Sequence, residues 1–581
     1  MSLPAIARHL TLAVRTACAL AAEDPALFTV QVARRLPRRV TAVPARVLRT
    51  SRPGSTAQIV GCWLVGWRDE ARAGVAHQAR RRPLGRVAAE IAVELDALGT
   101  SAASTPAPTA ARAAWRRGDL DLAIDTAPAR SMLRRRLGEE LAILTDDPPL
   151  APSACRPGPR PVSDRVAAVH LLVNSVPTTT SGYALRSHAV LRAQREAGID
   201  AVAATRLGYP VNVGLLTGRD LDVVDSVPYH RLVRWSSPRL PRERLERHVL
   251  AATDLAVRHG LRPGVGVVHT TTPFTNALVA QRVAATLGVP WVYEVRGLLE
   301  DTWAASFPTA QARHAAQGSQ RHHLARAREA QMAAAADHVV VLGETVRDSL
   351  VDRGVPAHRI TVIGNGVDDA LVTCTTSARD ARAALGLDPG GYWVGTVGSL
   401  VDYEGVDVLL EAVAELGGHG GVRLAVVGDG VARPALVRRA AALGLDVVMP
   451  GRVSPRDAVT WYKALDVFVV PRRDTAVTAA VVPLKPMAAM ALGRPVVASD
   501  LPALREIVGD VNAGLMVRPE DPHDLAQALA TLADDRDLAA RLGQAGRRFA
   551  ATRTWSAQGL AYRELYEHLC TQAPIHEGLA A

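Results

Sequence analysis

The sequence predicts an α/β protein built from two parallel-sheet domains, with an all-helical region in front of them. From Arg165 onward, short apolar strands alternate with helices, and a second series of the same kind starts at Tyr392. Such alternation is typical of parallel sheets covered by helices on both faces. Before Arg165, Ala, Leu and Arg recur at helical spacing. Because 581 residues exceed what one hydrophobic core supports, we expect several domains.

The helical region is assigned to residues 1–147. The segment from Trp115 to Ala123 has a weak resemblance to a helical-hairpin repeat, and plain helical packing is the alternative. Residues 148–163 read PPLAPSACRPGPRPVS, a composition that predicts a stiff, extended linker. The best candidates for an apolar span, Leu10–Ala22 and Ile59–Trp67, are short and carry or adjoin Arg, so no membrane-spanning segment is expected.

Most of the positive charge lies in the same region. Residues 1–160 hold 24 Arg, no Lys, and 14 Asp plus Glu, in a chain whose net charge is +11. This excess predicts contact with an anionic membrane surface or a protein partner, and a solvated Arg-rich face is the plain alternative. No nucleic-acid-binding module accompanies the charge, so nucleic acid is not expected as a partner.

Cysteine usage and the acidic residues bear on location and cofactors. The five cysteines are scattered, odd in number and without metal-ligand spacing, which favours a reducing compartment. No acidic pair or His cluster has ligand spacing, so no metal or other cofactor is expected. We expect a cytoplasmic protein, with peripheral attachment to the inner face of the plasma membrane through residues 1–160 as a further expectation.

The first α/β domain is assigned to residues 164–370. A loop that begins Ser181-Gly182-Tyr183 leads into a helix at 184–197, and His269 and Arg296 stand at strand ends. Open parallel sheets place their ligands at such ends. Strands are expected at the short apolar runs 166–174, 201–205, 265–269, 289–295 and 338–342.

The second α/β domain is assigned to residues 371–551. Gly398-Ser399 and Gly428 follow two of its strands, where glycine lets backbone N–H groups approach a phosphate. A last helix, in residues 552–572, is expected to pack back toward the first domain. Strands are expected at 394–398, 423–427, 447–449, 467–470 and 495–498, and helices at 521–532 and 536–551.

One stretch of the second domain, PLKPMAAMALGRPVVASD (483–500), predicts a small-residue helix, a turn at Gly493 and a buried strand. It contains Lys485, which with Lys463 makes up all the lysine of an arginine-rich chain. A lysine kept under this bias indicates a chemical role for Lys485, with chance as the alternative.

Further motifs stand in a fixed order along both α/β domains. They are YEVRGLLED (293–301), VIGNGVD (362–368), VGTVGSLVDYEGVDVLLEAV (394–413), LAVVGDG (424–430), PGRV (450–453) and ALDVFVVPR (464–472). Together with the stretch 483–500, they resemble glycosyltransferase family 4, over residues 165–570 but not over the first 160. The YEG and YEVRG forms are similar to a branch that builds capsule, lipopolysaccharide or other cell-envelope glycans. The resemblance implies the GT-B fold, in which two Rossmann-like domains face a cleft.

The resemblance implies a retaining, metal-independent, hexosyltransferase-type enzyme. A UDP- or GDP-sugar donor would lie in the second domain, and a glycan or lipid-linked acceptor would lie against the first. Positive side chains and helix N-termini would stabilise the departing diphosphate.

Position by position, the resemblance implies catalytic and binding candidates. The catalytic candidates are Arg296, Lys485 and His269, where salt bridges and a strand cap are the plain alternatives. Arg296 stands where many members have His, and it is not expected to act as a base because arginine stays protonated. Donor binding is implied for Gly398, Ser399, Gly428, Arg452, Val453, Arg472, Pro483, Leu484 and Ala488, and acceptor contact for Ser181, Gly182 and Tyr183.

Several positions depart from the family pattern. Ser399 and Glu404 stand where an Arg and a Lys are common. A Glu pair that usually contacts the donor is replaced by Ala488 and by Ala480 or, in the register of the YEG branch, Ala479. Each lost charge-assisted hydrogen bond costs about 1.5–3 kcal/mol.

Three functional hypotheses remain open at this point. The first is an active transferase acting on an envelope glycan or glycolipid, and the second is a non-catalytic or weakly active scaffold or regulatory protein. A sugar-nucleotide epimerase or a phosphorylase on the same architecture fits the motifs less well.

Overall fold

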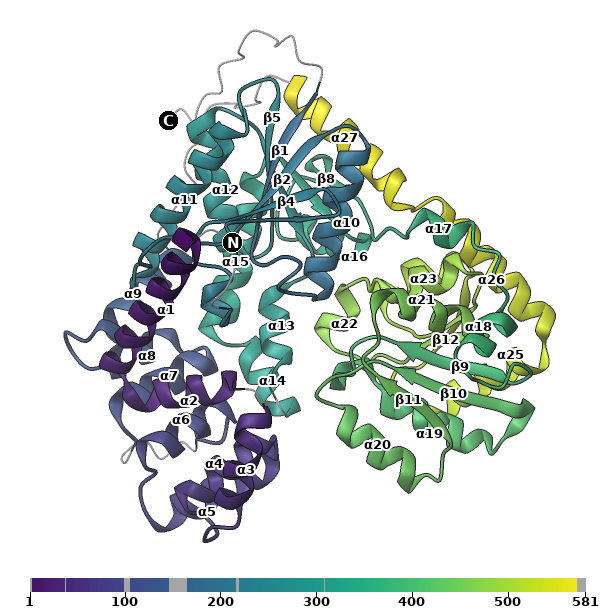
Figure 1. Ribbon diagram of the computed structural model, residues 1–581, viewed down its shortest axis with the longest axis horizontal. Helices are drawn as coiled ribbons and strands as arrows, with labels where there is room; N and C mark the ends of the chain where they lie inside the picture. Colours follow the sequence, from purple (N-terminus) through teal and green to yellow (C-terminus); the bar gives the residue numbers. More distant parts are fainter. Residues whose placement is uncertain are drawn as a thin grey trace.

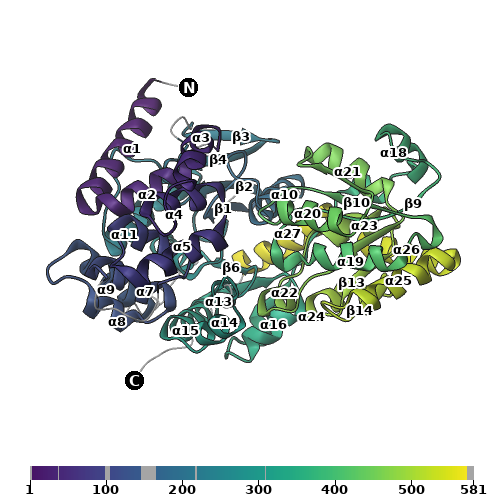
Figure 2. The same cartoon turned by 90° about the horizontal axis from the view of Figure 1, so that it is seen from below.

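The computed structural model describes residues 3–36, 38–98, 105–145, 165–215, 219–307 and 309–571. It confirms the predicted fold class, because a helical region precedes two α/β domains that each contain one sheet (Figure 1). The helical region lies against the first α/β domain, at the end of the molecule away from the second (Figure 2). The predicted linker, residues 148–163, lies outside the described residues, as does residue 572.

The described part of the helical region is a set of packed helices. Its best match to the sequence-based expectation is a hairpin of α7 and α8, in which Gly118 ends α7 with a φ of +93°. Small residues such as Ala111, Ala114 and Ala123 let the two helices pack closely. The helices are α1 (Leu3–Glu23), α2 (Pro25–Arg35), α3 (Arg38–Arg49), α4 (Thr56–Val65), α5 (Arg68–Arg81), α6 (Arg86–Glu94), α7 (Ala107–Arg117), α8 (Leu120–Thr126) and α9 (Met132–Thr145).

Helix α1 is longer than the apolar run expected from the sequence, which corrects the expected length of that run. Its stretch Ala5–Glu23 is 19 residues long with a mean hydropathy of 1.2, which by length and composition alone is enough to cross a membrane. The apolar run in the sequence is interrupted by Arg8 and Arg15, but a helix of this length tolerates both. In the structure, Leu12 of α1 is buried against Val211 of the first α/β domain.

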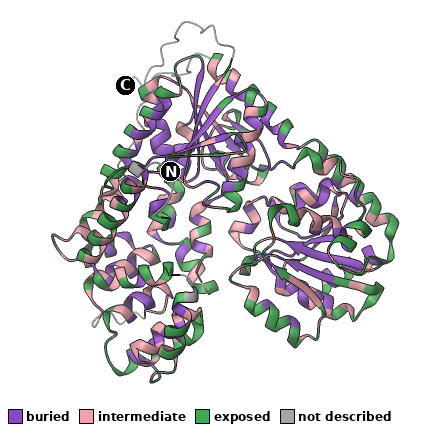
Figure 3. Cartoon of the chain, in the orientation of Figure 1, coloured by how far each residue is buried: buried purple, intermediate pink, exposed green. Residues whose placement is uncertain are grey.

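The first α/β domain is built on an eight-stranded sheet of order β3-β4-β2-β1-β5-β6-β7-β8. The β3–β4 pair is antiparallel and the other pairs are parallel. Every residue of β1 is buried, as expected for a strand covered on both faces (Figure 3). The strands are β1 (Ala167–Leu172), β2 (Asp200–Thr205), β3 (Leu221–Val224), β4 (Val227–Arg231), β5 (Gly266–Thr271), β6 (Trp291–Val295), β7 (His338–Val341) and β8 (Ile360–Val362).

The helices of the first domain follow the parallel strands. They are α10 (Gly182–Glu196), α11 (Pro241–Arg258), α12 (Phe274–Leu287), α13 (Leu299–Ala305), α14 (Ala310–Gln317), α15 (Gln320–Ala335) and α16 (Glu344–Val351).

The second α/β domain contains a six-stranded parallel sheet of order β11-β10-β9-β12-β13-β14. The strands are β9 (Tyr392–Val397), β10 (Val422–Val427), β11 (Val447–Gly451), β12 (Val467–Val470), β13 (Val496–Ser499) and β14 (Gly514–Val517). Its helices are α17 (Asp369–Val372), α18 (Ala378–Ala384), α19 (Val406–Leu416), α20 (Arg433–Ala442), α21 (Pro455–Ala464), α22 (Ala476–Ala480), α23 (Lys485–Ala491), α24 (Pro502–Leu504), α25 (Pro522–Asp534) and α26 (Arg536–Ala551).

The last described helix, α27 (Trp555–Thr571), returns to the first domain and packs along α10 (Figure 1). Tyr562 and Tyr566 are fully enclosed there, in the same apolar cluster as Ala168 of β1 and Val267 of β5. The first domain therefore completes its core with a segment that follows the second domain in the chain.

Candidate active site

The two domains meet at loops that follow their strands. At the start of α16, the Glu506 carboxylate accepts hydrogen bonds from the backbone N–H groups of Glu344 (3.0 Å) and Thr345 (2.6 Å). The Asn365 side-chain amide donates to the carbonyl oxygen of Val482 (3.0 Å). Helix α22 of the second domain also packs on α13 of the first. These contacts bring the end of β6 close to the segment around Lys485.

Arg296 follows β6 and is held in one orientation. Its Nε donates to Glu294 (2.9 Å), and its Nη1 donates to the carbonyl oxygen of Tyr183 (2.8 Å) and to the hydroxyl of Ser187 (2.8 Å). Its Nη2 is buried and has no hydrogen-bond partner. An unsatisfied buried donor costs about 1–3 kcal/mol, so an acceptor that reached this nitrogen would recover that cost.

The predicted acceptor loop lies beside Arg296. Ser181 caps α10 by accepting a hydrogen bond from the backbone N–H of Ala184 (3.3 Å). This cap fixes the start of the helix and so places the Tyr183 carbonyl on Arg296. Gly297 lies against the Tyr183 hydroxyl and the side chain of Val481, from the second domain, as the contacts of an added Cβ indicate.

Glu294 is the centre of a buried charge network. Its carboxylate accepts hydrogen bonds from Arg186 (2.8 Å), Arg296 (2.9 Å), His269 (3.0 Å) and Tyr562 (3.2 Å). Burial alone would raise the pKa of Glu294, but Arg296 and Arg186 outweigh burial and hold this pKa well below its usual range. The carboxylate is therefore ionised and fixes both guanidinium groups.

The structure does not place His269 at the cleft surface, which corrects its assignment as a residue that touches substrate. The ring is fully buried; its Nε2 donates to Glu294 (3.0 Å) and its Nδ1 accepts from Tyr566 of α27 (2.7 Å). It also stacks on His170 at 4.2 Å between ring centroids. Burial lowers the pKa of His269, so the ring is neutral and serves to position Glu294.

The cations of the second domain form a cluster around another carboxylate. Glu404 lies 3.1 Å from the Lys485 ammonium nitrogen and 3.1 Å from Arg472 Nη2. Burial would raise the pKa of Glu404, but Arg472 and Lys485 lower it overall. Burial lowers the pKa of Lys485. Glu404, at a position where a Lys is common, thus forms ion pairs with the two cations that were predicted to bind a diphosphate.

Lys485 lies directly over the first glycine turn. A Cβ built on Gly398 would fall 2.2 Å from Lys485 Cε, so any larger residue would displace the lysine. A Cβ on Gly428, whose φ is +139°, would fall 1.8 Å from the Gly398 carbonyl oxygen. Both positions therefore require glycine, and the neighbouring Ser399 is exposed.

Other predicted donor residues lie farther along the same edge of the sheet. Arg452 is exposed and Val453 half-buried, directly after the edge strand β11. Pro483 is buried just before α23, and Leu484 is half-buried. The structure brings Gly398, Lys485 and Arg472 together and leaves Arg452 at the rim.

The three alanines occupy different surroundings. Ala480 is 6% exposed and belongs to the hydrophobic cluster of the first domain, so α22 is packed across the domain interface. Ala479 is half-buried. Ala488 lines a cavity of about 200 Å³ together with Leu484, Arg186, Asp368 and Trp555. Because Ala480 lies in an apolar cluster, a glutamate there would place a carboxylate among hydrophobic side chains.

Sequence reasoning missed Arg186, Glu294, Glu506 and the tyrosines of α27. Glu294 stands two residues before Arg296, and this spacing on one strand was the available signal. Arg186 is separated from Glu294 by 108 residues and Tyr562 by 268 residues. In the described part of the chain, no three His, Cys, Asp or Glu side chains are grouped to hold a metal ion.

Two family models match the chain. The one described as "Glycosyl transferases group 1" matches residues 391–535, and the one described as "Glycosyl transferase 4-like domain" matches residues 181–366. Neither match includes the helical region.

The curated relatives of the chain include glycosyltransferases. The chain is 34% identical to a D-inositol 3-phosphate glycosyltransferase of Nocardia farcinica over 40% of its own length, and this match spans 53% of the relative, about half of it. It is 28% identical to the protein of the same name from Streptomyces avermitilis, over 75% of this chain and 94% of the relative.

Solved structures share the fold. Sucrose-phosphate synthase from Thermosynechococcus elongatus aligns with a TM-score of 0.56 and 23% identity, over 70% of this chain and 99% of that one. Anabaena HepE, solved in complex with UDP-glucose, aligns with a TM-score of 0.52 and 17% identity, over 69% and 99%. With two facing α/β domains and both family matches, the chain belongs to the glycosyltransferases of the family 4 type with a GT-B fold.

Proposed function

We propose that this protein is a retaining, metal-independent transferase that moves a hexose from a nucleotide sugar to a hydroxyl of a cell-envelope glycan, glycolipid or related acceptor. The observation that carries the proposal is a set of three cations at the domain interface. Arg296 follows β6 of the first domain and has an unpaired N–H, while Arg472 follows β12 and Lys485 begins α23 in the second domain. UDP-sugars are the first donors to test, because HepE was solved with UDP-glucose.

In the proposed reaction, the bond between the anomeric carbon and the diphosphate oxygen breaks, and its electron pair goes to the diphosphate. The acceptor hydroxyl oxygen forms the new bond on the same face of the sugar. Its proton goes to the departing diphosphate, because Arg296 stays protonated and takes none. Lys485 and Arg472 stabilise the charge that develops on the leaving group, which requires that they turn part of their contact from Glu404 to the phosphates.

The chain offers a matched pair of variants for the test, since its two lysines lie in the same domain. We expect titration calorimetry with UDP-, GDP- and dTDP-sugars to detect binding of one donor. Lys485→Ala should make the free energy of donor binding less favourable by about 1.5–3 kcal/mol, the value of a charged hydrogen bond. Lys463→Ala should bind as the native protein does. If no donor binds at millimolar concentration, the enzyme assignment fails.

A non-catalytic scaffold or regulatory protein is the second candidate. It is favoured by Ala480, which is packed into the first domain's cluster, and by the Glu506 contacts that join the domains. A protein that binds no donor but keeps both features would fit this candidate.

For location, we propose a cytoplasmic protein that attaches to the inner membrane face through its helical region. On α3, Val40, Val43 and Val47 are 56%, 68% and 66% exposed and share one face, with Arg46 and Arg49 in the last turn. An exposed apolar face beside arginines favours an anionic bilayer surface.

Vesicle sedimentation tests this attachment. Val43→Asp should reduce binding to anionic vesicles, whereas Val223→Asp, at the 63% exposed valine of β3, should leave it unchanged. Equal binding by the two variants would refute attachment through α3.

A further inference from the structure

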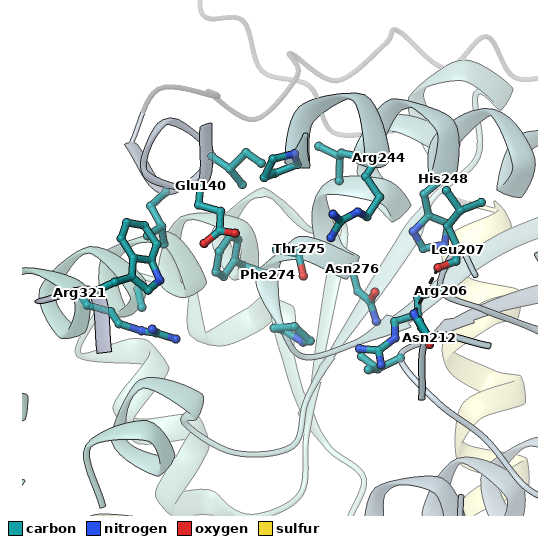
Figure 4. A pocket seen from close by; sticks show the side chains of 18 residues that line it. Glu140, Arg206, Leu207, Asn212, Arg244, His248, Phe274, Thr275, Asn276 and Arg321 are labelled. Carbon is teal, nitrogen blue, oxygen red and sulfur yellow. Dashed lines mark hydrogen bonds between the residues drawn. The ribbon is translucent and has the colours of Figure 1, made fainter. Parts of the chain in front are cut away.

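A cavity lies between the helical region and the first α/β domain. Its volume is about 560 Å³, in the range of small-molecule sites. Helix α9 forms one wall, and α11, α15 and the ends of β2 and β5 form the others (Figure 4). Neither family match covers α9, so this cavity is not a feature of the two matched domains alone.

The helical region is fixed to the first domain around this cavity. The Gln320 side chain, at the start of α15, accepts hydrogen bonds from the backbone N–H groups of Leu120 (2.9 Å) and Asp121 (3.1 Å) of α8. The backbone N–H of Arg321 donates to the Gly118 carbonyl (3.1 Å), and Glu139 of α9 accepts from the backbone N–H of Arg242 (3.1 Å). The wall that α9 supplies is therefore anchored on both sides.

The lining carries an excess of positive charge. Arg206, Arg244 and Arg321 line the cavity from three different elements, against the single carboxylate of Glu140. Among the residues that the structure describes, no ion pair holds any of these three arginines. Arg321 is placed instead by its guanidinium group, which stacks 4.8 Å from the Trp303 ring centroid.

Two buried polar groups of the lining lack partners. The side chain of His248 is 7% exposed and its Nε2 has no hydrogen-bond partner, and Arg206 Nε is likewise buried and unsatisfied. Burial, with Arg206 nearby, lowers the pKa of His248 to about 4, so the ring is neutral at neutral pH. Groups of this kind are costly unless a ligand pairs with them.

The remaining lining suits a compact ring with one charged substituent. Pro273, Phe274 and Asn276, at the start of the 14-residue helix α12, also line the cavity, and the backbone N–H of Phe274 donates to the Glu329 carboxylate (2.9 Å). Phe274 and Trp115 supply flat apolar surfaces. Figure 4 shows Glu140, Arg244 and Phe274 around the same space.

We propose that this cavity binds the phosphate-bearing part of a small polyhydroxylated acceptor, with Arg206, Arg244 and Arg321 facing the phosphate and Trp115 and Phe274 covering the ring. The inference rests on the proposed function, since a transferase needs a bound acceptor. It adds that the helical region supplies part of the acceptor site and that the acceptor is anionic.

The test measures binding without any donor, so that it is independent of catalysis. The probes are D-inositol 3-phosphate and glucose 6-phosphate, their phosphate-free parents, and inorganic phosphate, titrated by calorimetry into the full chain. We expect at least one sugar or cyclitol phosphate to bind about tenfold or more tightly than its parent and than inorganic phosphate. The comparison with inorganic phosphate distinguishes a site that binds the whole sugar or cyclitol phosphate from a site that binds only a free phosphate ion.

Variants with matched controls locate the binding. Arg244→Gln and Arg321→Gln should each lower the affinity for the phosphorylated probe about tenfold. The controls Arg247→Gln on α11 and Arg326→Gln on α15, both exposed and outside the lining, should leave this affinity unchanged. Glu140→Gln should tighten binding, a change of opposite sign that a misfolded variant does not produce.

Two results would overturn the proposal: a phosphorylated probe that binds no better than its parent, or binding that Arg244→Gln, Arg321→Gln and Glu140→Gln all leave unchanged. Donor titration of the same preparations judges the proposed function separately. Intact donor binding without phosphate selectivity would overturn this inference alone.

Discussion

The two sides of the domain interface each hold a pair of cations on one carboxylate, and they differ in how far that carboxylate is enclosed. Glu294 holds Arg186 and Arg296, and its side chain is 0% exposed. Glu404 holds Arg472 and Lys485, and its side chain is 8% exposed. α27 seals the first cluster, whereas the second lies beside the glycine turn at Gly398. The same chemistry thus positions a side chain on one side, and on the other it leaves two cations beside a glycine turn, where we propose that the donor binds.

The largest effect should come from breaking the sealed cluster. Glu294→Gln leaves Arg186 and Arg296 buried without a counter-charge, and we expect a loss of about 3–5 kcal/mol in the free energy of unfolding. Chemical denaturation measures this loss. The control Glu567→Gln removes one partner of an exposed ion pair on α27 and should cost less than about 1 kcal/mol. Similar losses of unfolding free energy in both variants would contradict a buried ion-pair network around Glu294.

The same change in the second cluster should cost less stability and improve binding. Glu404→Gln frees Lys485 and Arg472 from a competing carboxylate, so we expect UDP to bind at least about threefold more tightly. Calorimetry with UDP measures this, and Glu411→Gln, in an exposed pair on α19, is the control. Weaker UDP binding by Glu404→Gln would show that the carboxylate orients the cations rather than competing with a ligand.

Acid should distinguish the native protein from Glu404→Gln. The folded-state pKa of Glu404 lies below its ordinary value of 4.5, so its contribution to stability is present above pH 4.5 and is lost as the pH falls through the folded pKa. We therefore expect the free energy of unfolding, measured from pH 6 downward, to fall less steeply below pH 4.5 in Glu404→Gln than in the native protein. Parallel curves would exclude a lowered pKa at this position.

The last prediction concerns the cavity beside Ala488. Ala488→Glu restores a carboxylate at a position that lines about 200 Å³ of space, and we expect it to tighten UDP binding about tenfold if it reaches the ribose hydroxyls. Ala488→Gln has the same size without the charge and should gain less. Equal affinities would indicate that this cavity no longer receives a nucleotide.

Sequence patterns located the elements whose residues are contiguous and apolar. The five strands expected in each α/β domain are present, because short buried runs between Gly, Pro and Asp are a local signal. The β3–β4 hairpin was missed because β3 alternates exposed and half-buried residues, and β8 because it has three residues. The half-buried edge strand β14 was missed for the same kind of reason.

The site could be predicted only where it is local in sequence or common to the family. The glycine at position 398 indicated a close approach, and the structure places Lys485 over it. The pairing of Glu404 with Lys485 joins residues 81 positions apart, and the packing of Ala480 into the first domain depends on how two domains meet. Neither leaves a periodic pattern, and the arginine-lined cavity depends in addition on how α9 docks.

The return of α27 to the first domain has a consequence for how the chain is made. A ribosome delivers the first domain well before Tyr562 and Tyr566, which complete the hydrogen bonds of Glu294 and His269. During synthesis, domains generally form in order from the N-terminus. Here the first domain instead stays open along α10 until the second has emerged, so the nascent chain exposes this apolar face to chaperones for most of its translation.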